Sequence, residues 1–106
     1  MSYSIPMKEI IRSETFSDWL TALKDARARA RILMRIDRMK EGNFGDSEPI
    51  GDGLSEARIH YGPGYRVYFV KHGEAWVLLL CGGDKKSQRA DIKAALAMVD
   101  ELGGLT

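Results

Sequence analysis

The chain has 106 residues, which fits one domain on the usual range of roughly 100 to 200 residues per domain. Apolar residues make up 44% and charged residues 29%, a balance that predicts a packed fold and excludes a disordered chain. Sixteen Lys and Arg against fifteen Asp and Glu give a net charge of +1. The total charge therefore gives no reason to expect a nucleic-acid or membrane partner, and only the distribution of charge can do so.

Two further features bear on where the protein works. No apolar run approaches the roughly 20 residues that a membrane helix needs, so we expect no membrane partner. The single cysteine, Cys81, cannot form an internal disulfide. The cytoplasm is the expected compartment.

The first half of the chain predicts one strand and two helices. Residues 7–12 form a short segment with the β-branched Ile10 and Ile11 near its centre, which is typical of a short strand. Residues 15–18 have the form of a capping box and begin an amphipathic helix that ends near Asp25. A second amphipathic helix is expected over 26–41, with Gly42 as its stop signal.

The second half predicts three strands and a closing helix. Residues 42–53 contain four glycines, one proline and three acids without periodicity, and we expect a surface loop there. Residues 54–61, 65–71 and 75–81 are expected to be strands joined by short glycine-containing turns, which makes them an antiparallel meander. The last amphipathic segment, 86–102, predicts a helix.

The resulting order is β-α-α-β-β-β-α. Runs of helices followed by runs of strands predict a single α+β domain over residues 1–106, with the helices packed on one face of a mostly antiparallel sheet. On this prediction the other face of the sheet is partly bare, and we expect it to carry the function.

Basic residues gather on one side of the second predicted helix. At helical periodicity they fall within a stripe roughly 80° wide, opposite the apolar side; they are Arg27, Arg31, Arg35 and Arg38. One interpretation is an ordinary solvated face. The other is contact with RNA phosphates, whose affinity would come from counterion release and depend strongly on salt.

A second basic cluster follows the pair Gly82-Gly83 and consists of Lys85, Lys86, Arg89 and Lys93. Glycines before a helix N-terminus expose backbone N–H groups, and the helix dipole favours an anion there. The alternative is that Asp84 or Ser87 caps the helix and occupies these donors.

A third set lies on the two strands beside the Gly-Pro-Gly turn: Arg58, His60, Tyr61, Arg66 and Tyr68. If Arg58 and Arg66 share a face of the sheet, they can hold one phosphate and stabilise its added charge in a transition state. The alternative is that these arginines pair with Glu48 or Glu56 across the strands.

Other chemistries find little support. His60 and His72 are the only histidines and lack the spacing of a metal site, and Cys81 ends an apolar strand. No phosphate-binding loop or dinucleotide motif occurs, so we expect neither a metal nor another cofactor. Arginine, lysine, tyrosine and histidine together suit RNA cleavage in which the 2′-hydroxyl attacks the adjacent phosphate.

Four ordered segments resemble one protein family. The chain is similar to the phage-derived addiction-module killer proteins of the RelE/ParE toxin superfamily, which include HigB-like proteins, in these strings: Gly42-Asn43-Phe44-Gly45-Asp46, Leu54-Ser55-Glu56-Ala57-Arg58-Ile59, Tyr61-Gly62-Pro63-Gly64-Tyr65-Arg66-Val67-Tyr68-Phe69 and Leu78-Leu79-Leu80-Cys81-Gly82-Gly83-Asp84-Lys85. The resemblance spans residues 14–102. It implies the same RelE/ParE-like order of strands and helices.

The resemblance also implies a function. RelE-like toxins are ribosome-dependent mRNA endoribonucleases that work without a metal and are neutralised by a cognate antitoxin, often a helix-turn-helix protein. Arg66 matches an arginine that contacts the scissile phosphate, Lys85 a basic residue near it, and Arg58 a recurrent strand arginine. The mRNA and the ribosome are then the expected partners, with Lys86 and Arg89 joining the basic helix in RNA contact.

The general base is left open by the resemblance. RelE has a tyrosine, and HigB-type toxins a histidine, near the C-terminal helix, whereas this chain has neither after Trp76. By chemistry alone the base is His60, Tyr68 or Lys85. Two alternative functions follow: a ParE-like inhibitor of DNA gyrase that performs no chemistry, and an inactive member that only binds its antitoxin.

Overall fold

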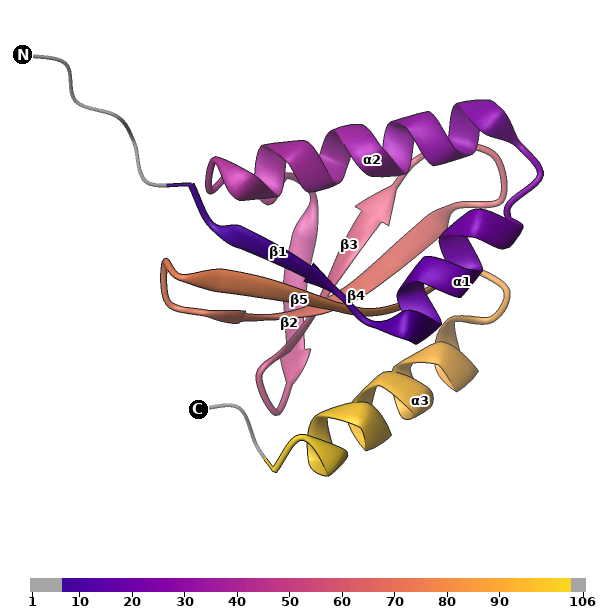
Figure 1. The fold of residues 1–106 in the computed structure, drawn as a ribbon. Helices are drawn as coiled ribbons and strands as arrows, with labels where there is room; N and C mark the ends of the chain where they lie inside the picture. The colour runs from indigo at the N-terminus through magenta and orange to yellow at the C-terminus, as the bar shows by residue number, and fades with distance from the viewer. Residues whose placement is uncertain (1–6, 104–106) are drawn as a thin grey trace, which may run out of the picture.

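The computed structural model describes residues 7–103 and contains three helices and five strands in that range (Figure 1). In chain order they are β1 (Glu9–Arg12), α1 (Glu14–Ala22), α2 (Ala26–Lys40), β2 (Ser47–Gly51), β3 (Leu54–Ile59), β4 (Tyr65–His72), β5 (Trp76–Asp84) and α3 (Gln88–Glu101).

The strands form one mostly antiparallel sheet in the order β1-β5-β4-β3-β2. The strands β3, β4 and β5 are the predicted antiparallel meander. Strand β1 pairs in parallel with β5 at the other edge of the meander, with Glu9 opposite Trp76. The α+β class and the mostly antiparallel sheet are therefore confirmed, and the predicted order of elements holds with one strand added.

The added strand, β2, lies where the sequence predicted a loop. It pairs antiparallel with β3, with Glu48 opposite Glu56, and the register shifts between Pro49 and Gly51. The sequence concealed this strand because an edge strand with few apolar residues shows no alternation. A proline is tolerated there because an edge strand leaves some N–H groups unpaired.

Polar caps fix where the first two helices begin. The hydroxyl of Ser13 accepts a hydrogen bond from the Phe16 N–H at 3.0 Å, so α1 begins before the capping box expected at residues 15–18. Asp25 accepts from the N–H groups of Arg27 and Ala28 and starts α2. Gly42 follows α2 with a φ of 87°, a conformation that glycine adopts without strain.

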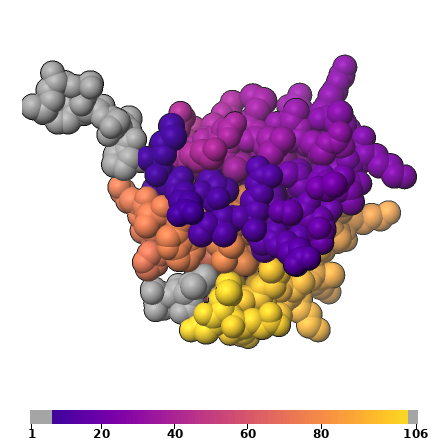
Figure 2. Space-filling model, viewed as in Figure 1, coloured from indigo at the N-terminus to yellow at the C-terminus, as the bar shows by residue number. Residues whose placement is uncertain are grey.

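The helices cover both faces of the sheet, which corrects the expectation of a single covered face. On one face α1 and α2 pack over Val67 and Phe69 of β4, and on the other α3 packs over Tyr68 and Val70. Figure 1 shows α2 and α3 on opposite sides of the sheet, and Figure 2 shows α1 and β1 filling the surface between them. Both faces of the central strands are apolar, so each needs a cover.

Within residues 7–103, no helix combines the length and the apolar character needed to cross a bilayer.

Candidate functional site

A cavity of about 400 Å³ lies at the turn between β3 and β4 and brings three of the five expected catalytic residues together. Those three are His60, Arg66 and Lys85. The remaining wall is formed by Ile59, Tyr61 and the Gly62-Pro63-Gly64 turn. The cavity therefore lies at one end of the sheet rather than on an open sheet face.

Strand pairing explains this convergence. Tyr65 pairs with Asp84 and Arg66 with Gly83, so the start of β4 lies beside the end of β5. Lys85 follows directly, and a Cβ placed on Gly64 would be only 3.5 Å from the Lys85 Cβ. Two segments that are distant in sequence thus present cations to the same space. Arg66 is half-buried, and its Nε has no hydrogen-bond partner among the described residues.

Arg58 lies opposite Arg66 on β3 but does not line the cavity. Its guanidinium group bonds the Asp46 carboxylate at 3.0 Å, bonds Glu48, and lies 3.4 Å from Glu56. These carboxylates raise the pKa of Arg58 against the opposing effect of desolvation. Arg58 therefore occupies its donors within the protein, as the pairing alternative anticipated.

Tyr68 is buried beneath α3 and also lies outside the cavity. Its hydroxyl donates to Glu56 at 3.0 Å, and Gln88 donates to the same carboxylate at 2.8 Å. Burial and the Glu56 carboxylate raise the pKa of Tyr68 far above its ordinary value. A neutral, enclosed phenol is poorly suited to accept a proton from a bound substrate.

His60 is exposed and lines the cavity. Its Nε2 lies 2.5 Å from the Asp46 Oδ2. The hydrogen bond from His60, together with that from Arg58, holds the pKa of Asp46 below its ordinary value despite some desolvation. Asp46 is therefore an ionised acceptor beside the imidazole ring.

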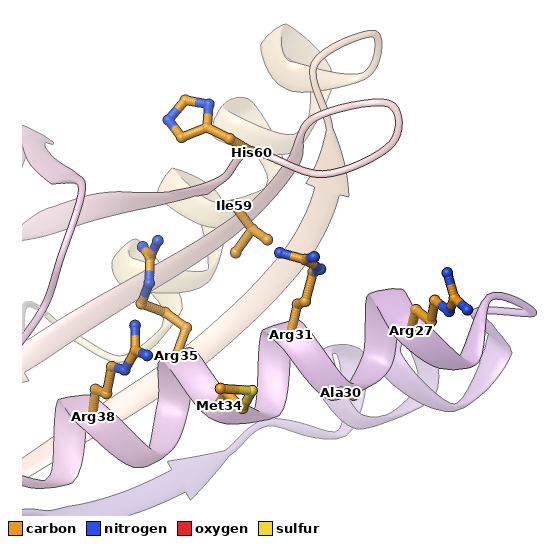
Figure 3. Close-up of a pocket in the computed structure, with 8 residues that line it drawn as sticks. All are labelled: Arg27, Ala30, Arg31, Met34, Arg35, Arg38, Ile59 and His60. Atoms are coloured by element: carbon orange, nitrogen blue, oxygen red, sulfur yellow. The ribbon is translucent and has the colours of Figure 1, made fainter.

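A second cavity, of about 660 Å³, runs along α2 and meets the first at Ile59 and His60. All four expected arginines of α2 line it, and Figure 3 shows them on the side of the helix that faces β3: Arg27, Arg31, Arg35 and Arg38. Apolar Ala30 and Met34 complete the lining from α2. We call this cavity the arginine groove.

Contacts around the arginine groove hold two of its arginines in place. The Arg31 guanidinium lies over the Tyr61 ring, 4.7 Å from its centroid. Arg35 donates to the backbone oxygen of Asp46 at 3.3 Å, and desolvation lowers the pKa of Arg35. The groove and the smaller cavity thus share Ile59 and His60 as their boundary, and Asp46 contacts His60 from outside both linings.

The glycine pair before α3 is followed by an acid that occupies two nearby backbone donors. The Asp84 carboxylate already accepts from the N–H groups of Lys86 and Ser87, at 2.9 and 3.0 Å. A Cβ on Gly82 would overlap the Trp19 ring, and one on Gly83 would overlap the Asp91 carboxylate. Both glycines serve close packing. Lys86 and Arg89 are exposed and line neither cavity.

Comparison with known proteins shows which family the chain belongs to. Residues 18–100 match the family described as "Phage derived protein Gp49-like". The chain belongs to the phage-derived Gp49-like family. It is also 51% identical over 89 residues to an uncharacterized protein of Haemophilus influenzae, an alignment that covers 84% of this chain and 90% of that protein. The Gp49-like family is associated with toxin–antitoxin modules.

Sequence reasoning missed one polar residue at the site of this Gp49-like protein. Asp46 ends the family-like string Gly42-Asn43-Phe44-Gly45-Asp46, but it lies in the segment expected to be a surface loop and was not among the expected site residues. Its contacts with Arg58, His60 and Arg35 all span ten or more residues of chain. No local sequence signal reports such contacts.

Proposed function

We propose that this Gp49-like protein is the toxin of a toxin–antitoxin module and that it cleaves RNA at the cavity between β3 and β4. The observation that carries the proposal is the convergence of Arg66, Lys85 and His60 on one cavity that opens into the arginine groove. Two cations suit a phosphodiester, and the imidazole suits proton transfer at neutral pH.

In the proposed reaction the 2′-hydroxyl of the RNA attacks the adjacent phosphorus, and His60 accepts the hydroxyl proton. Arg66 stabilises the charge that develops on the phosphorane. The bond to the 5′-oxygen then breaks, and Lys85 donates a proton to that oxygen. The products are a 2′,3′-cyclic phosphate and a 5′-hydroxyl, with one proton gained by His60 and one lost by Lys85. The nucleophile belongs to the RNA, so the step invokes no metal.

The arginine groove is proposed to bind the neighbouring phosphates. Its four arginines lie in a row along α2, so they present several cations to the backbone of one strand. The likeness to RelE/ParE toxins makes mRNA on the ribosome the proposed substrate, and a cognate antitoxin, of helix-turn-helix type, the proposed protein partner. Arg58 and Tyr68 have no catalytic role in this scheme because both lie outside the cavity.

Expression in bacteria tests the proposal directly. The protein is induced, and mRNA 5′ ends are mapped by primer extension with and without the neighbouring gene. Growth arrest with new 5′-hydroxyl ends is expected, and both should disappear for His60→Ala and Arg66→Ala but not for the control Arg12→Ala, at an exposed position outside both cavities. Growth arrest with intact mRNA would contradict RNA cleavage.

A toxin that binds DNA gyrase without chemistry is the second candidate. It is favoured by the enclosure of Arg58 and Tyr68, which removes two of the five expected catalytic groups from the cavity. Supercoiling assays with purified gyrase separate the two candidates, since only a gyrase toxin traps cleaved DNA. If neither activity is found and the protein still binds its antitoxin, it is the inactive member that the sequence left open.

A further inference from the structure

An acid contacts His60, the histidine at the boundary between the two cavities. Asp46 lies before β2 and His60 after β3, and the Asp46 Oδ2 is 2.5 Å from the His60 Nε2. His60 itself is 72% exposed, so by exposure alone this contact would be a surface ion pair of little energetic worth. This contact differs from an ordinary surface ion pair because other hydrogen bonds hold Asp46 in place.

Asp46 is fixed from three directions besides His60. Its second carboxylate oxygen accepts from the Arg58 guanidinium at 3.0 Å. Its backbone oxygen accepts from the Arg58 N–H at 2.9 Å and from the Arg35 guanidinium at 3.3 Å. A carboxylate anchored in this way can orient a mobile imidazole ring, as a free surface acid cannot.

Positive charge around His60 makes the Asp46 carboxylate more important. The cations that share its two cavities are Arg27, Arg31, Arg35, Arg38, Arg66 and Lys85, and Arg58 lies behind Asp46. A proton accepted by His60 adds one more positive charge among these cations, and a nearby carboxylate offsets that charge. Within residues 7–103, Asp46 is the carboxylate that bonds the ring.

We propose that Asp46 is a positioning residue for His60. It accepts a hydrogen bond from Nε2–H, leaves Nδ1 as the proton acceptor facing the RNA, and stabilises the imidazolium formed when that proton arrives. The inference rests on the proposed RNA cleavage and adds to it the residue that orients the base. It also assigns a reason for the Asp46–Arg58 pair, which holds the acid in place.

The test uses Asp46→Asn and a matched control, Glu48→Gln. Both variants remove one carboxylate from the Arg58 guanidinium, but only Asp46→Asn removes the negative charge beside His60, leaving an amide of the same shape in its place. Asp46→Glu serves as the conservative rescue. Each full-length protein is titrated by NMR, following the His60 ring signal, with the other histidine, His72, stacked on Trp76, as an internal reference. Cleavage of ribosome-bound mRNA by the same samples is measured across pH.

For Asp46→Asn we expect the His60 midpoint, and the rising limb of the pH–rate profile, to move to lower pH, because the carboxylate that stabilises the imidazolium is gone. We also expect kcat at neutral pH to fall about tenfold or more with KM unchanged. Glu48→Gln should change neither the His60 midpoint nor kcat. The His72 midpoint should be the same in every variant, and Asp46→Glu should recover part of the rate.

Three results would overturn the inference. An unmoved His60 midpoint in Asp46→Asn would show that the acid does not act on the ring. A moved midpoint with an unchanged rate would separate Asp46 from the reaction while leaving RNA cleavage intact. Absence of cleavage by the wild-type protein would remove the proposed function, whatever the titration shows, and the positioning role with it.

Discussion

Arg58 and Arg66 lie directly opposite each other on β3 and β4, yet only Arg66 lines the cavity. Two like charges at this position repel. Asp46, Glu48 and Glu56 offset the repulsion by surrounding Arg58. One arginine thereby becomes part of the framework, while its neighbour keeps donors for a ligand.

Replacing Arg66 by alanine should abolish most of the proposed activity. Loss of one donor to a developing phosphorane costs about 2 to 4 kcal/mol of transition-state stabilisation, a rate loss of roughly 30- to 1000-fold. Single-turnover RNA cleavage measures this loss. Arg12→Ala removes an equal charge at an exposed position outside both cavities and should cleave at the wild-type rate; a similar loss there would argue against a specific role for Arg66.

Arg38 in the arginine groove should contribute to RNA affinity in a salt-dependent way. If it contacts one phosphate, Arg38→Ala should reduce the slope of log affinity against log salt by about 0.7, the value for one contact to a single strand. Fluorescence anisotropy with a labelled single-stranded RNA measures the slope. Lys24→Ala, at an exposed position outside the groove, is the control and should leave the slope unchanged.

Tyr68→Phe should lower stability without affecting the chemistry. The change removes the hydroxyl that donates to buried Glu56, and a lost hydrogen bond to a buried charged group costs about 1.5 to 3 kcal/mol. Urea unfolding measures that cost. Because the phenol lies outside the cavity and its pKa is raised, the cleavage rate of the folded variant should equal that of the wild type. A rate loss without a stability loss would reinstate Tyr68 as a candidate base.

Because Asp25 caps α2, the free energy of unfolding should depend on pH in the acid range. Hydrogen bonds, the Ala28 N–H first, hold the pKa of this carboxyl below its ordinary value. A lowered folded-state pKa means that the stabilisation is full above about pH 4 and is lost as the pH falls through the folded value. Asp25→Ala should therefore be less stable than the wild type at pH 7, and the gap should narrow in strong acid. Unfolding curves across pH test this, with Asp25→Asn retaining the cap but not the pH dependence.

Cys81 should be unreactive in the folded protein. Burial, with the nearby Asp91 carboxylate, raises the pKa of its thiol to about 11, so the thiolate is scarce at pH 8. Iodoacetamide should label it only in denaturant. Rapid labelling of the native protein at pH 8 would show that α3 does not keep Cys81 covered.

The sequence alone was sufficient for the elements whose apolar residues repeat with a clear period. The helix α2, the strands β3 to β5 and the α+β class could be predicted because 3.6- and 2-residue periodicities are local properties of the chain. The shared face of the four arginines on α2 follows from the same periodicity.

Only the tertiary structure decided how the candidate residues are used. Four features depend on pairings between distant segments. They are the edge strand β2, the packing of α3 on the second face of the sheet, the ion pairs of Arg58 with Asp46 and Glu48, and the convergence of Arg66 and Lys85 on one cavity. Backbone hydrogen bonds and ion pairs across the sheet create these pairings, and they leave no periodic pattern in the residues that make them.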